Sequence, residues 1–352
     1  MPLQIVGIMI PCLTQSKLQS FKALVDGAAS VTVISHMHPD GDALGSSAAM
    51  GAYLRTTLSK DTVCVLPDTP PASISFIIPD TVRYIFADKA REEAEKRILS
   101  SDLIIVVDLN KPARTEPLEA CLRQASAPKI LIDHHLGPEE EAFNLVFSTP
   151  DISSASELVY WMLKSLTGST ESIPAEARNA LCAGMTTDTN NFSNSVFPST
   201  FAMASELIAS GTDRNAIISR IYNQYRENRI RLMGWMQSRE MKIMDNGSAR
   251  MILTKELQRQ FGYQEGETEG LVNVPLAIGK VRLSILLTEH DDRMRVSIRS
   301  KIGTSARELA MLYFNGGGHE NAAGGQLFFG VDIPDASAAE EYVESALKKY
   351  LG

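Results

Sequence analysis

Residues 31–46 read VTVISHMHPDGDALGS. The first four residues are all β-branched, which is typical of a strand that is buried on both faces of a parallel sheet. The segment Ala43–Met50 has a face of small residues and predicts a helix that packs closely against that sheet. A strand that leads directly into a helix indicates a βαβ unit. The polar residues His36, Asp40 and Asp42 then lie in the loop between strand and helix.

Three further apolar runs follow in the first half of the chain, at residues 103–107 (LIIVV), 129–132 (KILI) and 181–185 (LCAGM). We interpret each run as a strand, and we expect helices at about residues 154–166 and from residue 175 towards residue 182. This alternation predicts an α/β domain over residues 1–195, a parallel sheet with helices on both faces.

Acidic and imidazole side chains follow all four apolar runs, at His36, Asp40, Asp42, Asp108, Asp133, His134, His135 and Asp188. The carboxyl ends of parallel strands form the crevice in which such sheets bind ligands. So many unpaired charges in one crevice would be strongly destabilising. Metal ions would make the arrangement favourable, so the pattern predicts a metal site.

The spacing of these residues suggests two ions about 4 Å apart. His36 and Asp40 reach one ion, while Asp42, His134 and Asp188 reach the other, and Asp108 has two oxygens with which to bridge them. Mostly oxygen donors with one imidazole for each ion favour Mn²⁺, with Mg²⁺ and Co²⁺ as the other candidates. Asp133 then fixes a ring tautomer, and His135 contacts the substrate.

The remainder of the chain has a different pattern. Residues 196–240 predict a helical linker, and residues 241–352 a smaller α+β domain. Within that domain we expect a hairpin around residues 289–292, a helix with a capping box at Ser305 and Glu308, a glycine-rich turn at 316–318, a strand at 326–329 and a last helix over 337–351.

Composition limits the class of protein. A chain of 352 residues suits two domains, and a net charge of −8 argues against a protein that coats long nucleic acid. No apolar stretch reaches the ~18 residues of a membrane span, and residues 6–10 lack the basic residues that precede a signal sequence. The four cysteines match no zinc or disulfide pattern and predict buried thiols. We therefore expect a cytoplasmic protein with no membrane association; a homodimer is our hypothesis for its assembly.

The polar segments resemble the four motifs of the DHH phosphoesterase superfamily: HMHPDGDALGS at 36–46, VD at 107–108, DHH at 133–135 and TDT at 187–189. GGGHENAAGG at 316–325 resembles the glycine-rich motif of the DHH-associated C-terminal domain. The resemblance covers essentially the whole chain, and its length and layout are similar to the nanoRNase and 3′-phosphoadenosine-5′-phosphate (pAp) phosphatase branch. It implies a bimetal Mn²⁺ hydrolase that cuts short oligoribonucleotides and removes the 3′-phosphate of pAp.

The resemblance implies His36, Asp40, Asp42, Asp108, His134 and Asp188 as metal ligands, with Asp108 and His135 as catalytic residues. It also implies that Arg299 and His319 bind the phosphate of the substrate. Physical chemistry supports this second group, because a guanidinium donates two parallel hydrogen bonds to phosphate. Gly316, Gly317 and Gly318 would let backbone amides approach a phosphate closely, although they also suit a helix end and a turn.

Other functions are compatible with the same residues. The superfamily includes inorganic pyrophosphatases and exopolyphosphatases, but the segment at Arg299 lacks the Arg-Lys-Lys cluster of the pyrophosphatases. Linear dinucleotides such as pApA are a further substrate class, whereas a long-chain exonuclease would need additional domains. A nucleotide-binding sensor without activity is the alternative from another class, and it would have lost a metal ligand.

Overall fold

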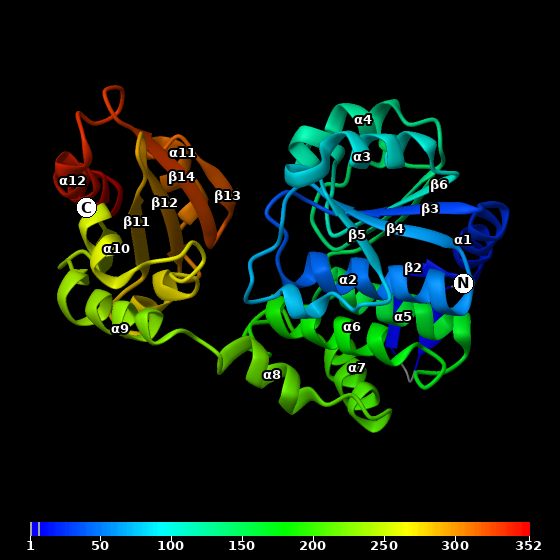
Figure 1. The fold of residues 1–352 in the computed structure, drawn as a ribbon. Coiled ribbons are helices and arrows are strands. Elements are labelled where there is room, and N and C mark those ends of the chain that lie inside the picture. The colour runs from blue at the N-terminus through cyan, green and yellow to red at the C-terminus, as the bar shows by residue number, and fades with distance from the viewer. Residues whose placement is uncertain (1, 6–7) are drawn as a thin grey trace. The chain divides into compact units, whose positions relative to one another are not determined.

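The computed structural model describes the backbone of residues 2–5 and 8–352 and divides it into two compact units, residues 1–224 and 225–352 (Figure 1). The boundary lies within the segment 196–240 that the sequence predicts as a linker. That segment forms the three helices α7 (Pro198–Ala209), α8 (Arg214–Tyr222) and α9 (Glu227–Trp235). Val6 and Gly7, which belong to the segment 6–10 considered above as a signal sequence, lie outside the described residues.

The first unit contains a six-stranded sheet in which every neighbouring pair of strands is parallel, in the order β5-β4-β3-β6-β7-β8. A short antiparallel pair, β1 and β2, precedes it. The bounds are β1 (Pro2–Ile5), β2 (Ile8–Thr14), β3 (Ser30–Ile34), β4 (Asp61–Leu66), β5 (Arg83–Phe86), β6 (Leu103–Val107), β7 (Lys129–Asp133) and β8 (Leu145–Ser148). The strand order reverses direction between β3 and β6, and such a switch point is where open α/β sheets bind ligands.

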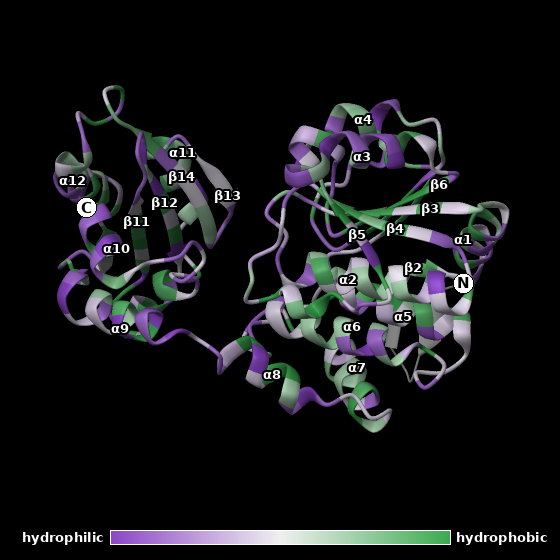
Figure 2. Cartoon of the chain, viewed as in Figure 1, coloured by the Kyte–Doolittle hydropathy of each residue, from purple (hydrophilic) through white to green (hydrophobic). Residues whose placement is uncertain are grey.

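Helices cover both faces of this sheet, as the sequence predicts (Figures 1 and 2). On one face lie α1 (Gln15–Gly27), α2 (Gly41–Ala52), α5 (Ala155–Thr167) and α6 (Ala175–Asp188), and on the other α3 (Ala87–Ser100) and α4 (Glu119–Gln124). The strands are hydrophobic along both faces because each face packs against a helical layer. The predicted α/β class is therefore confirmed.

Helices α2 and α6 approach each other backbone to backbone because glycines lie at their contact. A Cβ atom on Gly45 would lie 2.7 Å from the carbonyl oxygen of Ala180. A Cβ atom on Gly184 would lie 2.1 Å from Oγ of Ser156 and 3.1 Å from the carbonyl oxygen of Gly41. Real side chains do not fit at such distances, so these positions require glycine. This contact fixes where the first turn of α2 and the last turn of α6 meet.

One predicted strand is wrong. Residues 181–185 belong to α6, which continues the helix expected from residue 175 to Asp188, so Asp188 ends a helix rather than following a strand. The run is apolar because this part of α6 is buried between α2 and α5. A short buried helix segment and a buried strand have the same apolar pattern, so periodicity alone does not separate them.

Helix α7 is joined to α5 by a polar cluster around Glu206. The carboxylate of Glu206 accepts hydrogen bonds from the hydroxyl of Tyr160, from Nζ of Lys164 at 2.5 Å and from Oγ1 of Thr170 at 3.0 Å. Burial acts to raise the pKa of Glu206, but these three donors outweigh it and hold that pKa below its ordinary value. These contacts hold α7 against α5, and they depend on the negative charge of Glu206.

The second unit is built on the six-stranded mixed sheet β13-β14-β12-β11-β10-β9, which confirms the predicted α+β domain. Its strands are β9 (Lys242–Ile243), β10 (Ser248–Leu253), β11 (Leu283–Glu289), β12 (Arg293–Ser300), β13 (Gly317–His319) and β14 (Ala322–Phe328), and its helices besides α9 are α10 (Lys255–Phe261), α11 (Ala306–Tyr313) and α12 (Ala339–Leu351). The hairpin β11–β12 and the cap of α11, where Ser305 accepts from the Glu308 amide, agree with the sequence prediction.

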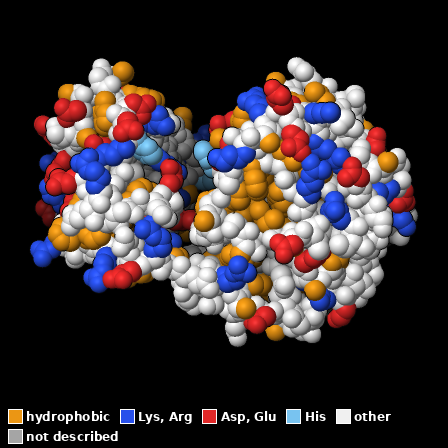
Figure 3. All heavy atoms as spheres, viewed as in Figure 1, with side chains coloured by type: hydrophobic (Ala, Val, Ile, Leu, Met, Phe, Trp, Pro, Cys, Tyr) orange, Lys and Arg blue, Asp and Glu red, His pale blue; other side chains and the backbone are white. Residues whose placement is uncertain are grey.

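Three further features are the cysteines, the charges on the surface and the character of the helices. The four cysteines, Cys12, Cys64, Cys121 and Cys182, are buried free thiols, as predicted. Figure 3 shows acidic and basic side chains intermixed on the viewed face. In the part of the chain that the structure describes, no helix combines the length and the apolar character that crossing a bilayer requires.

Candidate metal centre

The site is built at the switch point of the first sheet, where β3 and β6 end side by side. His36 follows β3 by two residues and is 5% exposed, and Asp108 follows β6 directly and is 2% exposed. Asp108 has a left-handed backbone, with φ of 58°. This conformation is uncommon for residues other than glycine, and Asp and Asn adopt it more readily than most. It turns the carboxylate of Asp108 into the crevice.

His36 and Asp40 lie on one side of Asp108. Nδ1 of His36 donates to the carbonyl oxygen of Met37 at 2.8 Å, so Nε2 is the nitrogen that faces the crevice. Nε2 lies 3.3 Å from Oδ2 of Asp108 and 3.9 Å from Oδ1 of Asp40. The carboxylate of Asp40 caps α2 by accepting from the amides of Asp42 and Ala43. A ring fixed through one nitrogen is how proteins orient a metal-binding histidine.

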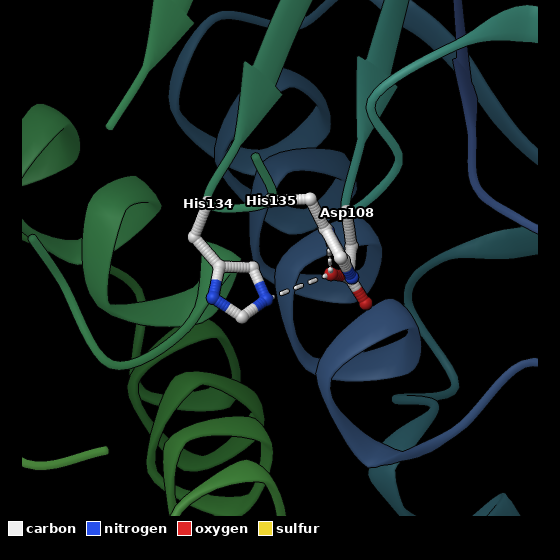
Figure 4. A group of neighbouring side chains, drawn as sticks. All are labelled: Asp108, His134 and His135. Atoms are coloured by element: carbon white, nitrogen blue, oxygen red, sulfur yellow. Dashed lines mark ion pairs between the residues drawn. The ribbon is translucent and has the colours of Figure 1, made fainter. Parts of the chain in front are cut away.

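Asp42, His134 and Asp188 lie on the other side of Asp108. Nε2 of His134 lies 3.4 Å from Oδ1 of Asp108, and 3.8 Å from Oδ2 of both Asp42 and Asp188. Figure 4 shows the ring of His134 and the carboxylate of Asp108 facing one another. The two oxygens of Asp108 thus point to the two histidines separately. That is the arrangement expected of a bridging carboxylate.

The carboxylate of Asp42 has a second set of contacts, which the sequence analysis missed. Its oxygens accept from the amides of Ala155 and Ser156, at 2.7 and 2.8 Å, in the first turn of α5. The N-terminus of a helix carries free N–H groups and partial positive charge, which stabilise a carboxylate. The N-terminus of α5 is therefore part of the site, although the contact joins residues 113 and 114 positions apart.

Burial and the crowding of like charges together set the electrostatics of the cluster. Burial, and then the charges of Asp108 and Asp188, raise the pKa of Asp42 well above its ordinary value. Burial, with the repulsion of Asp108 and Asp40, also raises the pKa of Asp188. Burial acts against protonation of His36, but the hydrogen bond and the charge of Asp108 outweigh it and raise the pKa of His36 to about 9. The cluster therefore favours positive charge, whether as protons or as bound cations.

The donor set fits divalent metal ions. Ligand atoms of His36, Asp40 and Asp108 lie within 4.8 Å of one another, as do those of Asp42, His134 and Asp188, and those of Asp108, His134 and His135. Oxygen donors with few imidazoles suit Mn²⁺ and related ions, and the cations would offset the repulsion among the carboxylates. The structure thus brings together all six ligands that the sequence predicts, in the two groups that the spacing suggests.

His135 is held beside this cluster by two neighbours. Asp133 is fully buried, and its carboxylate accepts from Nδ1 of His135 at 2.8 Å and from the His135 amide at 3.1 Å. On the other side, Nη1 of Arg114 lies 3.1 Å from Nε2 of His135. Asp133 therefore orients the ring of His135. Arg114 was not predicted, because no motif or spacing distinguishes it from other arginines.

In the second unit, Arg299 and His319 share one face of the sheet. Both pair with Ala322, Arg299 across β12–β14 and His319 across β13–β14, and directly opposed residues point to the same side. The two residues are thus two strand spacings apart, or about 10 Å. Burial lowers the pKa of Arg299, and the carboxylate of Glu269 opposes this effect.

The glycine-rich motif has a packing role that the sequence left open. The expected turn is partly strand, since β13 begins at Gly317. A Cβ atom on Gly316 would lie 2.0 Å from the carbonyl oxygen of Gly324, and the amide of Gly316 donates to Ala310. A Cβ atom on Gly318 would lie 2.7 Å from the carbonyl oxygen of Ala322, whereas Gly317 has nothing within 4 Å. Gly316 and Gly318 therefore allow close backbone packing, and Gly317 leaves open space.

Comparison with known proteins agrees with the fold and identifies the family. The sequence matches the DHH family, N-terminal domain, over residues 30–185 and the DHHA1 domain over residues 250–348. It is 28% identical to the bifunctional oligoribonuclease and PAP phosphatase NrnA of Bacillus subtilis, over 84% of this chain and 90% of that protein. The NrnA of Thermus thermophilus is 27% identical, with 87% and 86% of the two chains covered.

A solved structure supports the same assignment. The crystal structure of an exopolyphosphatase-related protein from Bacteroides fragilis superposes with a TM-score of 0.88 and 35% sequence identity, and it covers 96% of this chain and 97% of that one. The two family matches and this whole-length similarity show that the chain belongs to the DHH family and is a metal-dependent enzyme of the phosphodiesterase and phosphatase class.

Proposed function

We propose that the protein uses two Mn²⁺ ions to hydrolyse short oligoribonucleotides, linear dinucleotides such as pApA, and the 3′-phosphate of pAp. The observation that carries the proposal is the carboxylate of Asp108, which lies between the His36 and the His134 clusters with one oxygen toward each. The names of the Bacillus subtilis and Thermus thermophilus relatives support the choice of substrates.

His36, Asp40 and Asp108 would hold one ion, and Asp42, His134, Asp188 and Asp108 the other. Bound ions of this kind supply a water of lowered pKa and neutralise charge on phosphoryl oxygens. The chain's own contribution is to position them: the N-terminus of α5 fixes Asp42, and Met37 fixes the ring of His36. In the hydrolysis, the oxygen of a water bonds to phosphorus, the bond from phosphorus to the leaving oxygen breaks, and a proton passes to that oxygen.

His135 would lie beside the reacting phosphate, with its ring held in place by Asp133. Arg299 and His319 would bind a phosphate of the substrate through the shared face of the second sheet. Gly317, which has open space around it, is the position of the glycine motif at which a ligand could approach the backbone most closely.

A second candidate is exopolyphosphatase activity, which the name of the Bacteroides fragilis structure favours. Inorganic pyrophosphatase activity uses the same type of metal site, but the Arg299-Ser300-Lys301 segment lacks a basic cluster. A sensor without activity is disfavoured because none of the six proposed ligands is missing from the site.

One substrate panel tests these functions. Purified protein is assayed with Mn²⁺ or Mg²⁺ against pAp, pApA, a five-residue RNA, pyrophosphate and polyphosphate, with Asp108→Asn as the inactive control. We expect turnover of the RNA, pApA and pAp that is faster with Mn²⁺ than with Mg²⁺. Preferred turnover of polyphosphate would support the second candidate, and turnover of none with either metal would contradict both. A homodimer and a cytoplasmic location stay predictions, for sedimentation and cell fractionation to measure.

A further inference from the structure

Arg114 is a cation at the edge of the carboxylate cluster. It lies in the 3-10 segment Pro112–Leu118 that follows β6, six residues after Asp108. Its carbonyl oxygen accepts from the amide of Met37 at 2.8 Å, and its own amide donates to Lys111 at 3.1 Å. The backbone of Arg114 is thereby attached to the loop that carries His36, so the guanidinium has a defined place beside the site.

The contact between Arg114 and His135 determines which groups are hydrogen-bond donors. A guanidinium only donates, so Nε2 of His135 accepts its hydrogen bond at 3.1 Å. Nδ1 of His135 then carries the ring proton and donates it to the buried carboxylate of Asp133. In this arrangement the ring offers no second N–H to a phosphoryl oxygen. The guanidinium of Arg114 is the donor that remains beside it.

In the described part of the chain, Arg114 has no carboxylate partner, in contrast to Arg97 and Arg123 of the same unit. Arg97 pairs with Asp61 at 2.6 Å, and Arg123 with Glu119 and Glu139 at 2.9 and 2.6 Å. Among residues 10–352, whose side chains the structure describes, the one side-chain hydrogen bond of Arg114 is that to His135, and no carboxylate forms an ion pair with it. A partly buried guanidinium without a carboxylate is suited to an anionic ligand.

We propose that Arg114 is a further catalytic residue, whose guanidinium binds the non-bridging oxygens of the scissile phosphoryl group while His135 and Asp133 hold it in place. This rests on the proposed function. The planar fork of arginine matches two phosphoryl oxygens, and fixed donors aimed at developing charge act mainly in the transition state. Arg114 therefore adds positive charge on the side of Asp108 that carries His135, beside the metal ligands.

The test compares Arg114→Ala and Arg114→Lys with the matched control Arg123→Ala, whose arginine is on α4 and is paired with glutamates. We expect Arg114→Ala to lower kcat for pApA about 100-fold with little change in KM. Arg114→Lys should recover only part of the rate, because an ammonium cannot replace the fork. Free guanidinium ion at tens of millimolar should partly restore Arg114→Ala and should not accelerate Arg123→Ala. Mn²⁺ affinity should be the same in all variants.

A binding measurement separates this inference from the proposed function. Titration of inorganic phosphate into the Mn²⁺-loaded protein should give affinity about tenfold weaker for Arg114→Ala than for wild type and for Arg123→Ala. If the wild type hydrolyses no substrate but this difference is found, the proposed function fails, and Arg114 keeps only its role in binding phosphate. The inference would be overturned if Arg114→Ala had the same phosphate affinity and the same kcat as the wild type. A loss of Mn²⁺ affinity as large as the loss of kcat would overturn it as well.

Discussion

Replacing Gly41 with alanine should separate the two helices that carry metal ligands. Gly41 lies between Asp40 and Asp42 at the start of α2, and an added Cβ atom would lie 2.7 Å from Cβ of Thr187 in α6. Oγ1 of Thr187, at 2.1 Å, could rotate away, but Cβ is fixed to the α6 backbone. Ordinary contacts begin at 3.4 Å, so α2 and α6 would have to move apart by the difference, about 0.7 Å.

This displacement is large for a metal site. Asp42 adjoins Gly41, and Asp188 adjoins Thr187, so two of the four ligands of the proposed second ion would move with their helices. Ligand distances in metal sites vary by only about 0.2 Å. We expect the Mn²⁺ affinity of Gly41→Ala to fall at least about tenfold, as it does when the support of a ligand is lost. The overpacked contact should also lower the free energy of unfolding by about 2 kcal/mol.

The assay is calorimetric titration of Mn²⁺, together with urea unfolding followed by circular dichroism. Gly27→Ala is the matched control, because Gly27 ends α1 at the surface and an added Cβ atom would meet nothing within 4 Å. Gly41→Ala should differ from wild type in both measurements, and Gly27→Ala in neither by more than about 1 kcal/mol. If Gly41→Ala binds Mn²⁺ as tightly as the control, the close contact does not set the ligand geometry.

The other predictions concern the charge at three positions. Asp108→Asn should reduce turnover at least about 1,000-fold and change the free energy of unfolding by less than about 2 kcal/mol, since size and backbone preference are kept; retained turnover with Mn²⁺ would rule out a bridging role. Arg299→Ala should raise KM for pAp about tenfold with kcat within about threefold, whereas Arg293→Ala, whose partner is the adjacent Asp292 in the hairpin turn, should change neither. A fall in kcat at constant KM would contradict a binding role for Arg299. The free energy of unfolding of Glu206→Gln should be about 1 kcal/mol lower than that of the wild type at pH 7. This value is discounted because Glu206 is partly exposed to solvent. Because the folded-state pKa of Glu206 is depressed, this contribution is present above the unfolded pKa of ~4.3 and is lost as pH falls through the folded pKa. Urea unfolding at pH 7 and pH 3.5 measures it, and an equal difference at both values would contradict the ionic contact.

The position of the site could be predicted because the sheet is parallel. Strands β3, β6 and β7 each have a centre rich in Val, Ile and Leu, a pattern that arises when both faces are buried. In such a sheet the residue after each strand lies at the same edge as the residue after its neighbours. His36, Asp108 and His134 could therefore be placed together from their positions in the chain alone.

Asp188 lies beside His134 in the candidate site, but the strand from which the sequence predicts this position is a helix. Its helix approaches the sheet edge because glycines and other small residues allow α6 to pack against α2. Small apolar residues are compatible with a buried helix and with a buried strand, so the sequence did not distinguish them. The length of the helical segment from residue 175 was the signal that favours the helix.

Arg114 and the N-terminus of α5 could not be predicted, because each acts through a contact distant in sequence. Arg114 meets His135 21 positions later, and the amides of Ala155 and Ser156 meet Asp42 more than 110 positions earlier. Neither contact leaves a periodic or local pattern. Only the folded chain shows that an arginine and a helix end lie beside the candidate metal centre.

The left-handed backbone at Asp108 limits how this enzyme can be inactivated for structural work. Most side chains at φ of 58° would strain the end of β6 and displace the loop that follows. Asparagine and glycine tolerate that conformation. They are therefore the replacements that would disable hydrolysis and leave the backbone of the substrate site undisturbed. A substrate-trapping variant for crystallography should therefore carry asparagine at this position rather than alanine.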